Sequence, residues 1–410
     1  MDNNDVIDFQ KAVKKELTEN LIPFWVQHSL DHEHGGFIGR MTQDFKIESG
    51  APKGLILNSR ILWTFSALYQ WQQKPVFLEM AQRAYEYLLE FFHDSENGGY
   101  FWMLDAKGNA LDRIKKVYGQ AFVIYAFSEF ARAAHRPDAA QHAKELFNLM
   151  EDKCRDKTYN GYFENFNPDW SLADDCRLSE KDMDEKKSMN SHLHIMEAYT
   201  NLYRDCREEP VRQALHTLIG IFQNHIIHRK RHCFMLFFDE TWQHKTDLIS
   251  FGHDIEGSWL LIESAEVLGD DSMLARQKDI SLKMVEAVIE RGLYKDGSLF
   301  YEGTVNDIVD SDRHWWPQAE AVVGFINAYQ LSDDDQYLDK ALRCWQFIEN
   351  FIVDNKHGEW VWRVSKDGSL YTNEYKVSEW KSPYHGIRAC LEIMNRLDMI
   401  NLAEGEEHLR

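Results

Sequence analysis

Two kinds of helical pattern alternate along the chain. Residues 55–70 are apolar on nearly every side, which predicts a helix buried on two faces. Residues 75–92 open with Pro75 and carry apolar residues only at helical spacing, which predicts a helix with one exposed face. The first pattern returns near Tyr118, Asn190, His253, Trp316 and His385, and the second near 139–153, 211–227, 273–290 and 336–352. With an amphipathic N-terminal helix near 6–27, twelve helices are predicted.

A motif of a polar residue and aromatic residues, with glycine in five of its six copies, accompanies this alternation. Its copies are HGGFIGR from His34, NGGYFWM from Asn97, NGYFENF from Asn160, HCFMLFF from His232, DGSLFYE from Asp296 and HGEWVWR from His357. Their starts are 63, 63, 72, 64 and 61 residues apart. Such spacing indicates a repeat architecture, and each copy predicts a turn followed by a short strand or hairpin.

Six inner helices ringed by six outer ones form an all-α (α/α)6 barrel with short β-hairpin loops, which is the fold we expect. The first helix and the last unit would close the ring. An open α-solenoid would produce the same helix pairs, but its terminal repeats need polar capping faces. The last inner helix is as apolar as the others, which favours closure. With only 8 prolines and no Ser/Gly-rich linker, we expect a single domain over residues 1–410.

The composition excludes several classes of binding partner. The chain has 46 Lys and Arg against 67 Asp and Glu, a net charge of −21 that would repel nucleic acid and anionic membranes. Its six cysteines form neither a disulfide framework nor a zinc-ribbon spacing. No apolar run reaches the roughly 18 residues of a membrane span, and the N-terminus lacks a signal-peptide pattern. We therefore expect a cytoplasmic monomer that acts on a small molecule.

Polar residues interrupt the apolar pattern at the start of every inner helix. Because these starts would meet at one mouth of the ring, that mouth is the predicted site. The clusters are Asn58 and Arg60; Tyr118 and Gln120; Asn190, His192 and His194; His253, Asp254 and Glu256; Arg313, His314, Trp315 and Trp316; and Tyr384 and His385.

These residue types favour proton transfer on a sugar. Imidazoles titrate near neutral pH, and tryptophan rings offer flat faces to a pyranose. Although His192 and His194 form H-x-H, no recognised metal-ligand spacing is present, so we predict neither a metal nor any other cofactor. Glycoside hydrolysis would need a matched carboxylate pair. The acidic run around Asp182 reads better as a solvated loop, from which Asp182 reaches the mouth.

Six motifs resemble the N-acylglucosamine 2-epimerase superfamily, and within it the cellobiose 2-epimerase group. They are LNSRILWTF around Arg60, KVYGQAF around Tyr118, SMNSHLH around His194, SFGHDIE around His253, DRHWWPQAE around Trp316 and EWKSPYHGIRA around His385. The similarity spans essentially the whole chain. One departure is Ser382, where the family usually has glycine.

The resemblance implies an (α/α)6 barrel that epimerises C2 of the reducing-end glucose of β-1,4-linked disaccharides such as cellobiose and lactose, without metal or nucleotide. It implies a catalytic core of Arg60, His194, His253 and His385. The implied substrate-binding residues are Tyr118, Asn190, Glu256, Trp315, Trp316, Trp380 and Asp182.

C2 epimerisation passes through a cis-enediolate, which requires removal of a proton and its return to the opposite face. We assign His253 and His385 to these transfers, Arg60 to the developing oxyanion and His194 to ring opening or to the O1/O2 proton. Three alternatives stay open: an aldose–ketose isomerase, an N-acylglucosamine 2-epimerase and a glycoside hydrolase on the same barrel.

Overall fold

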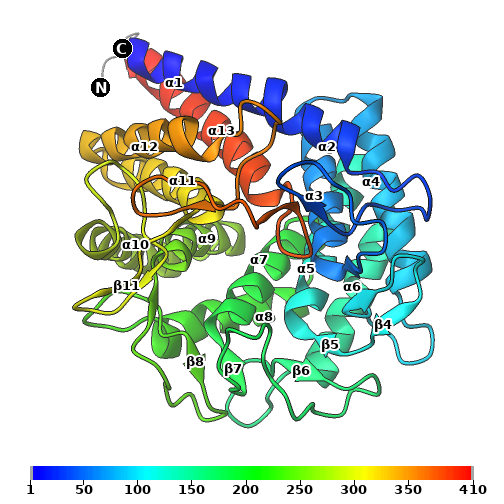
Figure 1. Ribbon diagram of the computed structural model, residues 1–410. Helices are drawn as coiled ribbons and strands as arrows, with labels where there is room; N and C mark the ends of the chain where they lie inside the picture. Colours follow the sequence, from blue (N-terminus) through cyan, green and yellow to red (C-terminus); the bar gives the residue numbers. More distant parts are fainter. Residues whose placement is uncertain (1–2, 408–410) are drawn as a thin grey trace.

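The computed structural model describes residues 3–407, so residues 1–2 and 408–410 of the predicted 1–410 domain lie outside the described part. Its helices are arranged as a ring of two layers (Figure 1). The inner layer consists of α3 (Leu55–Trp71), α5 (Val117–Ala134), α7 (Met189–Cys206), α9 (Phe251–Leu268), α11 (Trp315–Ser332) and α13 (Tyr384–Glu407). These are the six predicted inner helices, and the (α/α)6 barrel is confirmed.

The outer layer also follows the prediction, with one local difference. It consists of α1 (Asn3–Glu16) with α2 (Ile22–His28), α4 (Pro75–Tyr87), α6 (Pro137–Lys153), α8 (Glu209–Ile221), α10 (Asp271–Arg291) and α12 (Asp335–Phe347). Short π-helical segments extend or interrupt four of these outer elements, at Leu17–Leu21, Leu88–Phe92, Phe222–Ile226 and Ile348–Ile352. A π turn adds one residue per turn, which a 3.6-residue apolar period does not reveal.

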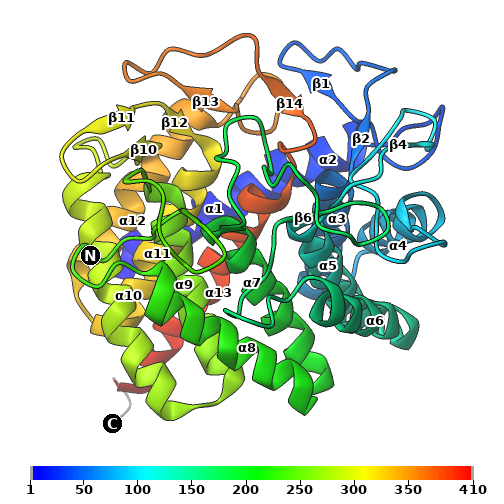
Figure 2. The same cartoon turned by 90° about the horizontal axis from the view of Figure 1, so that it is seen from below.

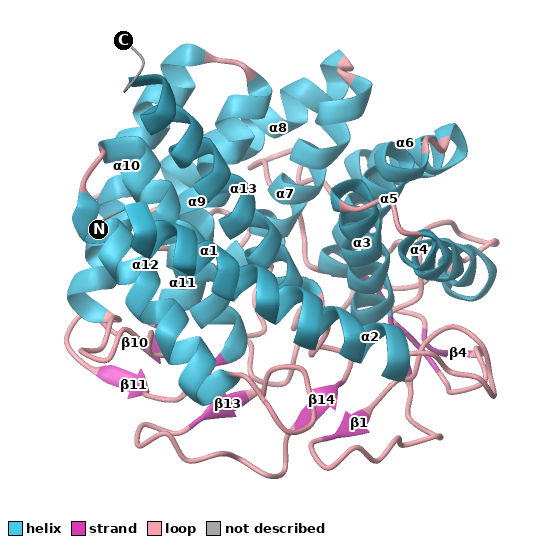
Figure 3. Ribbon diagram, turned by 90° about the horizontal axis from the view of Figure 1, so that it is seen from above, coloured by secondary structure: helices cyan, strands magenta, loops and turns pink. Residues whose placement is uncertain are grey.

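The strands and the long loops gather at one end of the ring (Figure 3). Five strand pairs join the segment before an inner helix to the hairpin of the following unit: β2 (Lys53–Gly54) with β3 (Met103–Leu104), β5 (Lys115–Lys116) with β6 (Asn165–Phe166), β7 (Lys187–Ser188) with β8 (Phe237–Phe238), β9 (Ile249–Ser250) with β10 (Glu302–Gly303), and β12 (Arg313–His314) with β13 (Arg363–Val364). Two hairpins add β4 (Ala110–Asp112) and β11 (Ile308–Asp310). All of these pairs are antiparallel.

The sixth strand pair closes the ring. Strand β14 (Tyr375–Val377) of the last unit pairs with β1 (Met41–Thr42) of the first, with Met41 opposite Val377. Helix α1 lies beside α13 (Figures 1 and 2), and Gln10 Nε2 donates to the carbonyl of Met394 at 3.3 Å. An open solenoid has no such contact between its first and last repeats, so this alternative is wrong.

Buried ion pairs lock the loops to the starts of the inner helices. The residue two positions before α3, α5 and α7 is a buried lysine whose ammonium meets an aspartate of a Gly-aromatic turn: Lys53 with Asp31 at 2.7 Å, Lys115 with Asp94 at 2.8 Å and Lys187 with Asp156 at 2.7 Å. These three lysines are at most 1% exposed. A buried charge is tolerated only when paired, so these contacts fix where each inner helix begins.

Candidate active site

The starts of the inner helices carry both structural and chemically available polar groups. In four inner helices, the side chain of the fourth residue accepts a hydrogen bond from the backbone N–H of a hairpin residue. The bonds are 2.7–2.9 Å long and run to Gln120 from Tyr100, to His192 from Tyr162, to Asp254 from Phe234 and to Gln318 from Leu299. These buried acceptors satisfy backbone donors that would otherwise be unpaired. Gln120, His192 and Asp254 of the predicted clusters therefore hold the loops in place.

Arg60 is the sixth residue of α3 and is 4% exposed. Its Nη2 donates to the Tyr118 hydroxyl at 3.0 Å, and its Nη1 donates to the carbonyl of Trp380 at 3.4 Å. The guanidinium also lies over the rings of Phe122 and Tyr384, 4.5 and 5.1 Å from their centroids. Its Nε has no hydrogen-bond partner among the described residues. Arg60 is thus a buried cation held mainly by aromatic faces, without a neutralising carboxylate in hydrogen-bond contact.

His194 is oriented by a carboxylate on its own helix. Its Nδ1 lies 2.9 Å from Oε2 of Glu197, one turn along α7, and both side chains are buried. The imidazole packs edge-on against Tyr118, with ring centroids 5.1 Å apart, which brings it next to the Arg60 contact. An imidazole whose Nδ1–H is held by a carboxylate presents Nε2 as its free acceptor.

His253 and His385 both pack against one tryptophan. The ring centroid of Trp316 is 4.7 Å from that of His253 and 5.6 Å from that of His385. His253 Nδ1 lies 2.7 Å from the Ser250 hydroxyl, and His385 Nδ1 lies 2.7 Å from Oε1 of Glu320. Nδ1 of each imidazole is therefore hydrogen-bonded, which leaves Nε2 available for proton transfer.

Burial and neighbouring cations keep these two histidines neutral. Desolvation lowers the pKa of His253, and the charges of His194 and Arg60 lower it further. Desolvation also holds the pKa of His385 well below its ordinary value, with additional effects from Arg60, Arg388, His194 and His253. The same four predicted groups thus lie close enough to interact electrostatically. A neutral imidazole is the form that accepts a proton.

A buried arginine that the sequence analysis missed connects the carboxylates behind these histidines. Arg388 donates through Nη1 to Glu197, and through Nη2 to Glu256 at 2.6 Å and Glu320 at 2.7 Å. Glu197 and Glu320 in turn hold His194 and His385. The sequence signal for this network is a single charged residue within each apolar inner-helix segment. Since burying an unpaired charge there is costly, such residues are expected to pair with one another.

The pKa values of the three carboxylates around Arg388 are shifted in different directions. Desolvation dominates for Glu256 and raises its pKa to about 7, with a further increase from Glu320. Desolvation raises the pKa of Glu320 as well. Glu197 behaves oppositely, because Arg388 and the hydrogen bond from His194 outweigh its burial and lower its pKa to about 2. Glu256 Oε2 has no partner among the described residues, so this predicted binding residue keeps one oxygen free.

The three predicted tryptophans occupy different surroundings. Trp316 and Trp380 are half-buried, and Trp380 lies 6.1 Å from Tyr118 between ring centroids. Trp315 is only 4% exposed and packs against Trp362 at 4.9 Å, with the Lys381 ammonium 5.0 Å from its ring. Trp316 and Trp380 therefore offer accessible ring surface near the histidines, whereas Trp315 is largely covered by protein.

The remaining predicted residues lie at the rim of this cluster. Asn190 is the second residue of α7 and is half-buried, and its Oδ1 has no partner among the described residues. Asp182 accepts hydrogen bonds from the backbone N–H and the hydroxyl of Ser179. Its charge contributes to raising the pKa of Tyr118 and Tyr301, both of which are raised chiefly by burial, so the long loop brings Asp182 toward the site.

One group of side chains near the site has metal-ligand character. Single ligand atoms of Glu256, Glu320 and His385 lie within 4.8 Å of one another. Arg388 Nη2 donates to one oxygen of each of the two glutamates, so a permanent cation is already bonded to both. The donor set therefore suits the guanidinium better than a divalent metal.

The barrel with its histidines, Arg60 and accessible tryptophans is of a sugar-isomerase type, and comparison with known proteins identifies its family. A family model described as N-acylglucosamine 2-epimerase matches residues 36–389. The chain belongs to this family, which confirms the resemblance seen in the six motifs.

Particular relatives lie nearer still. The chain is 43% identical over 386 residues to the cellobiose 2-epimerase of Bacteroides fragilis, covering 94% of this chain and 98% of that protein. The structure of cellobiose 2-epimerase from Bacillus thermoamylovorans matches with a TM-score of 0.90 at 36% identity, over 95% of this chain and 99% of that chain. The structure of a sugar epimerase from a ruminal bacterium matches with a TM-score of 0.91 at 37% identity, over 94% and 98% of the two chains.

Proposed function

We propose that this chain epimerises C2 of the reducing-end glucose of β-1,4-linked disaccharides, converting cellobiose to glucosyl-mannose and lactose to epilactose. The observation that carries the proposal is the pair of neutral imidazoles, His253 and His385, which both pack against Trp316 and lie close to the buried cation of Arg60. The 43% identity to a cellobiose 2-epimerase supports the choice of substrate.

The reaction begins with the open-chain aldose. Its C2 proton is acidic because C2 adjoins the C1 carbonyl, and its removal gives a cis-enediolate. One of the two histidines accepts this proton through Nε2, and the other returns a proton to the opposite face of C2. Their fixed Nδ1 contacts with Ser250 and Glu320 support a catalytic orientation of both rings.

Arg60 and His194 act on the oxygens. As the C2–H bond breaks, negative charge develops on O1, and a guanidinium in a water-poor aromatic setting stabilises that charge. The Tyr118 hydroxyl, which accepts from Arg60, orients the cation. His194, held by Glu197, opens the pyranose ring or moves the proton between O1 and O2.

The substrate is held by ring surfaces and by polar groups with unused bonding capacity. Trp316 and Trp380 stack on the sugar faces, and Trp315 packs against His385 with ring centroids 6.4 Å apart. The free oxygens of Asn190 and Glu256 bind sugar hydroxyls, and Asp182 binds from the loop. No step calls on a metal or another cofactor.

Incubation of the purified protein with cellobiose, followed by separation and linkage analysis of the sugars, tests the proposal. Glucosyl-mannose is the expected product. A keto-disaccharide would instead indicate an aldose–ketose isomerase, and free glucose a glycoside hydrolase. Parallel incubation with N-acetylglucosamine tests the N-acylglucosamine 2-epimerase alternative, for which N-acetylmannosamine would be diagnostic.

We further propose that the whole ring acts as one catalytic domain, as a cytoplasmic monomer. All six cysteines are free thiols, which fits a reducing compartment. No helix among the described residues is long and apolar enough to cross a membrane. Every proposed site residue comes from this one chain, and light scattering coupled to size-exclusion chromatography tests the monomer.

A further inference from the structure

A polar cavity lies at the end of the ring opposite the candidate active site. Its volume is about 290 Å³. The lining residues come from the middle and later turns of α3, α5, α7 and α9 and from the first half of α13, whereas the candidate active site lies where these helices begin. Its floor includes Glu197 and Arg388, and exposed Gln70 and Asn395 lie at its rim.

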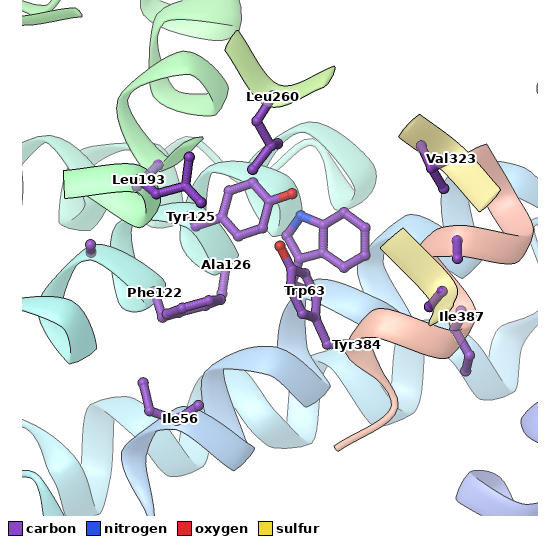
Figure 4. Close-up of a cluster of buried hydrophobic side chains, with 14 of the residues drawn as sticks. Ile56, Trp63, Phe122, Tyr125, Ala126, Leu193, Leu260, Val323, Tyr384 and Ile387 are labelled. Carbon is purple, nitrogen blue, oxygen red and sulfur yellow. The ribbon is translucent and has the colours of Figure 1, made fainter. Parts of the chain in front are cut away.

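Aromatic rings form part of its wall. Trp63 and Tyr125 are stacked with ring centroids 5.3 Å apart and planes 15° apart, and Figure 4 shows the two side chains next to each other above Tyr384. Half-buried Trp71 and buried Trp259 also line the cavity. Flat apolar faces combined with amide and carboxylate groups are the surfaces that recognise the C–H and O–H groups of a sugar.

The charges of the cavity are already paired within the protein. Arg132 donates to Glu129, Arg204 donates to Glu263, and Arg388 donates to Glu197. The remaining lining carboxylate, Glu392, accepts from Arg396 at 3.1 Å. No unpaired charge is left to select an ion, so the chemistry favours an uncharged ligand.

Some hydrogen-bonding capacity is nevertheless unused. Trp63 Nε1 and Arg388 Nε belong to lining residues and are buried without a hydrogen-bond partner among the described residues. Unsatisfied buried donors are uncommon and point to a missing partner. We propose that this cavity is a second binding site, which takes an uncharged polyhydroxy compound the size of a monosaccharide or alditol.

Binding at this cavity does not depend on the proposed epimerase activity, but an occupant would contact residues that support the candidate active site. An occupant would lie against Glu197 and Arg388, the same side chains that hold His194 and, through Glu320, His385. The two ends of the barrel would thus share one buried network.

D-Glucitol is a suitable probe, because it has no carbonyl carbon and cannot be epimerised. Protein labelled with 5-fluorotryptophan is titrated with glucitol and followed by ¹⁹F NMR, with resonances assigned through Trp63→Phe, Trp71→Phe and Trp316→Phe. Saturable shifts of the Trp63 and Trp71 resonances are expected. Shifts confined to Trp316, or no shift at all, would overturn the proposal.

Two variants locate the binding. Ala67→Phe fills the cavity from its wall and should abolish the Trp71 shift, whereas Ala140→Phe, at a half-buried alanine of α6 away from the cavity, should leave it unchanged. Should Ala67→Phe fail to fold, Gln70→Ala at the exposed rim should weaken glucitol binding severalfold. Equal glucitol binding by wild type and the folded rim or wall variant would contradict the assignment.

Discussion

Glu320 and His385 come from adjacent inner helices, and their side chains meet at 2.7 Å between Oε1 and Nδ1. The carboxylate is itself held by Arg388 at 2.7 Å, so it is positioned before any substrate arrives. When Glu320 is ionised, its carboxylate only accepts hydrogen bonds, so this contact places the His385 proton on Nδ1 and leaves Nε2 able to take a proton. The base function of His385 therefore depends on Glu320.

Glu320→Gln should lower kcat by roughly 10²-fold, because the amide can turn its NH₂ group toward Nδ1 and favour the wrong tautomer. KM should change much less, since Glu320 is buried behind the imidazole. Steady-state kinetics with cellobiose measure both constants. Glu266→Gln, at an exposed glutamate of α9, is the matched control. An unchanged kcat in a folded Glu320→Gln protein would mean that the carboxylate does not orient the base.

Replacing Trp316 or Trp380 should mainly weaken substrate binding. Each ring contributes on the order of 1 kcal/mol of stacking beyond its buried area, so Trp316→Ala and Trp380→Ala should each raise KM about fivefold or more. Exchange of the C2 proton in bound substrate should be affected less. Phenylalanine at either position should restore part of the lost affinity. If alanine changes only the melting temperature, the rings serve core packing.

Removal of metal ions should leave activity intact. Glu256, Glu320 and His385 lie close together, but Arg388 already supplies the positive charge between the two carboxylates. Dialysis against EDTA followed by assay in chelator should give the activity of untreated protein. A loss that is restored by one added divalent ion would show that a metal takes part.

The ring and its ends were predictable from the sequence because their signals are local. Each Gly-aromatic motif forces a turn within a few residues, and an inner helix shows its burial through its own apolar faces. Candidate residues such as Arg60 and His385 were found because polar groups interrupt that pattern at a fixed place in the repeat. Even so, local position did not show that His192 would accept a hydrogen bond from a hairpin N–H.

The network behind the histidines was not predictable in the same way. Arg388 meets Glu197 across 191 residues of sequence and Glu256 across 132 residues. Each of these residues appears in the sequence only as one charge within an apolar helix. Which charges meet depends on helix rotation and on closure of the ring, and neither is recorded in local spacing.

The pKa of Glu256 leads to a prediction on stability. Burial raises it from 4.5 to about 7, so the folded state binds this proton more tightly than the unfolded chain does. This contribution to stability is fully present below the unfolded pKa of 4.5 and is lost as pH rises through about 7. Between pH 5 and 8, wild type should therefore lose on the order of 2 kcal/mol through this group.

Glu256→Gln mimics the protonated side chain and should remove that part of the pH dependence. Urea unfolding at pH 5 and pH 8 gives the two free energies for each protein. The variant should lose less stability than wild type over this interval, while Glu266→Gln should behave as wild type. Equal losses in wild type and Glu256→Gln would show that Glu256 does not titrate in this range.

The two-histidine assignment predicts where solvent hydrogen enters the product. If His253 and His385 act on opposite faces, epimerisation in D₂O should place deuterium at C2 of the mannosyl unit, because an imidazolium proton exchanges with solvent. His253→Asn and His385→Asn should each lower turnover by at least about 10²-fold. The remaining imidazole should still exchange the C2 proton of one epimer without completing the conversion.

Proton NMR of cellobiose in D₂O measures this C2 exchange, and chromatography of the same samples measures net epimerisation. His216→Asn, at an exposed histidine of α8, is the control and should match wild type in both rates. The two site variants should differ in the epimer whose C2 proton they exchange, because each retains the base of a different face. Near-wild-type epimerisation by either folded variant would refute the assignment, since a single base would then serve both faces of the intermediate.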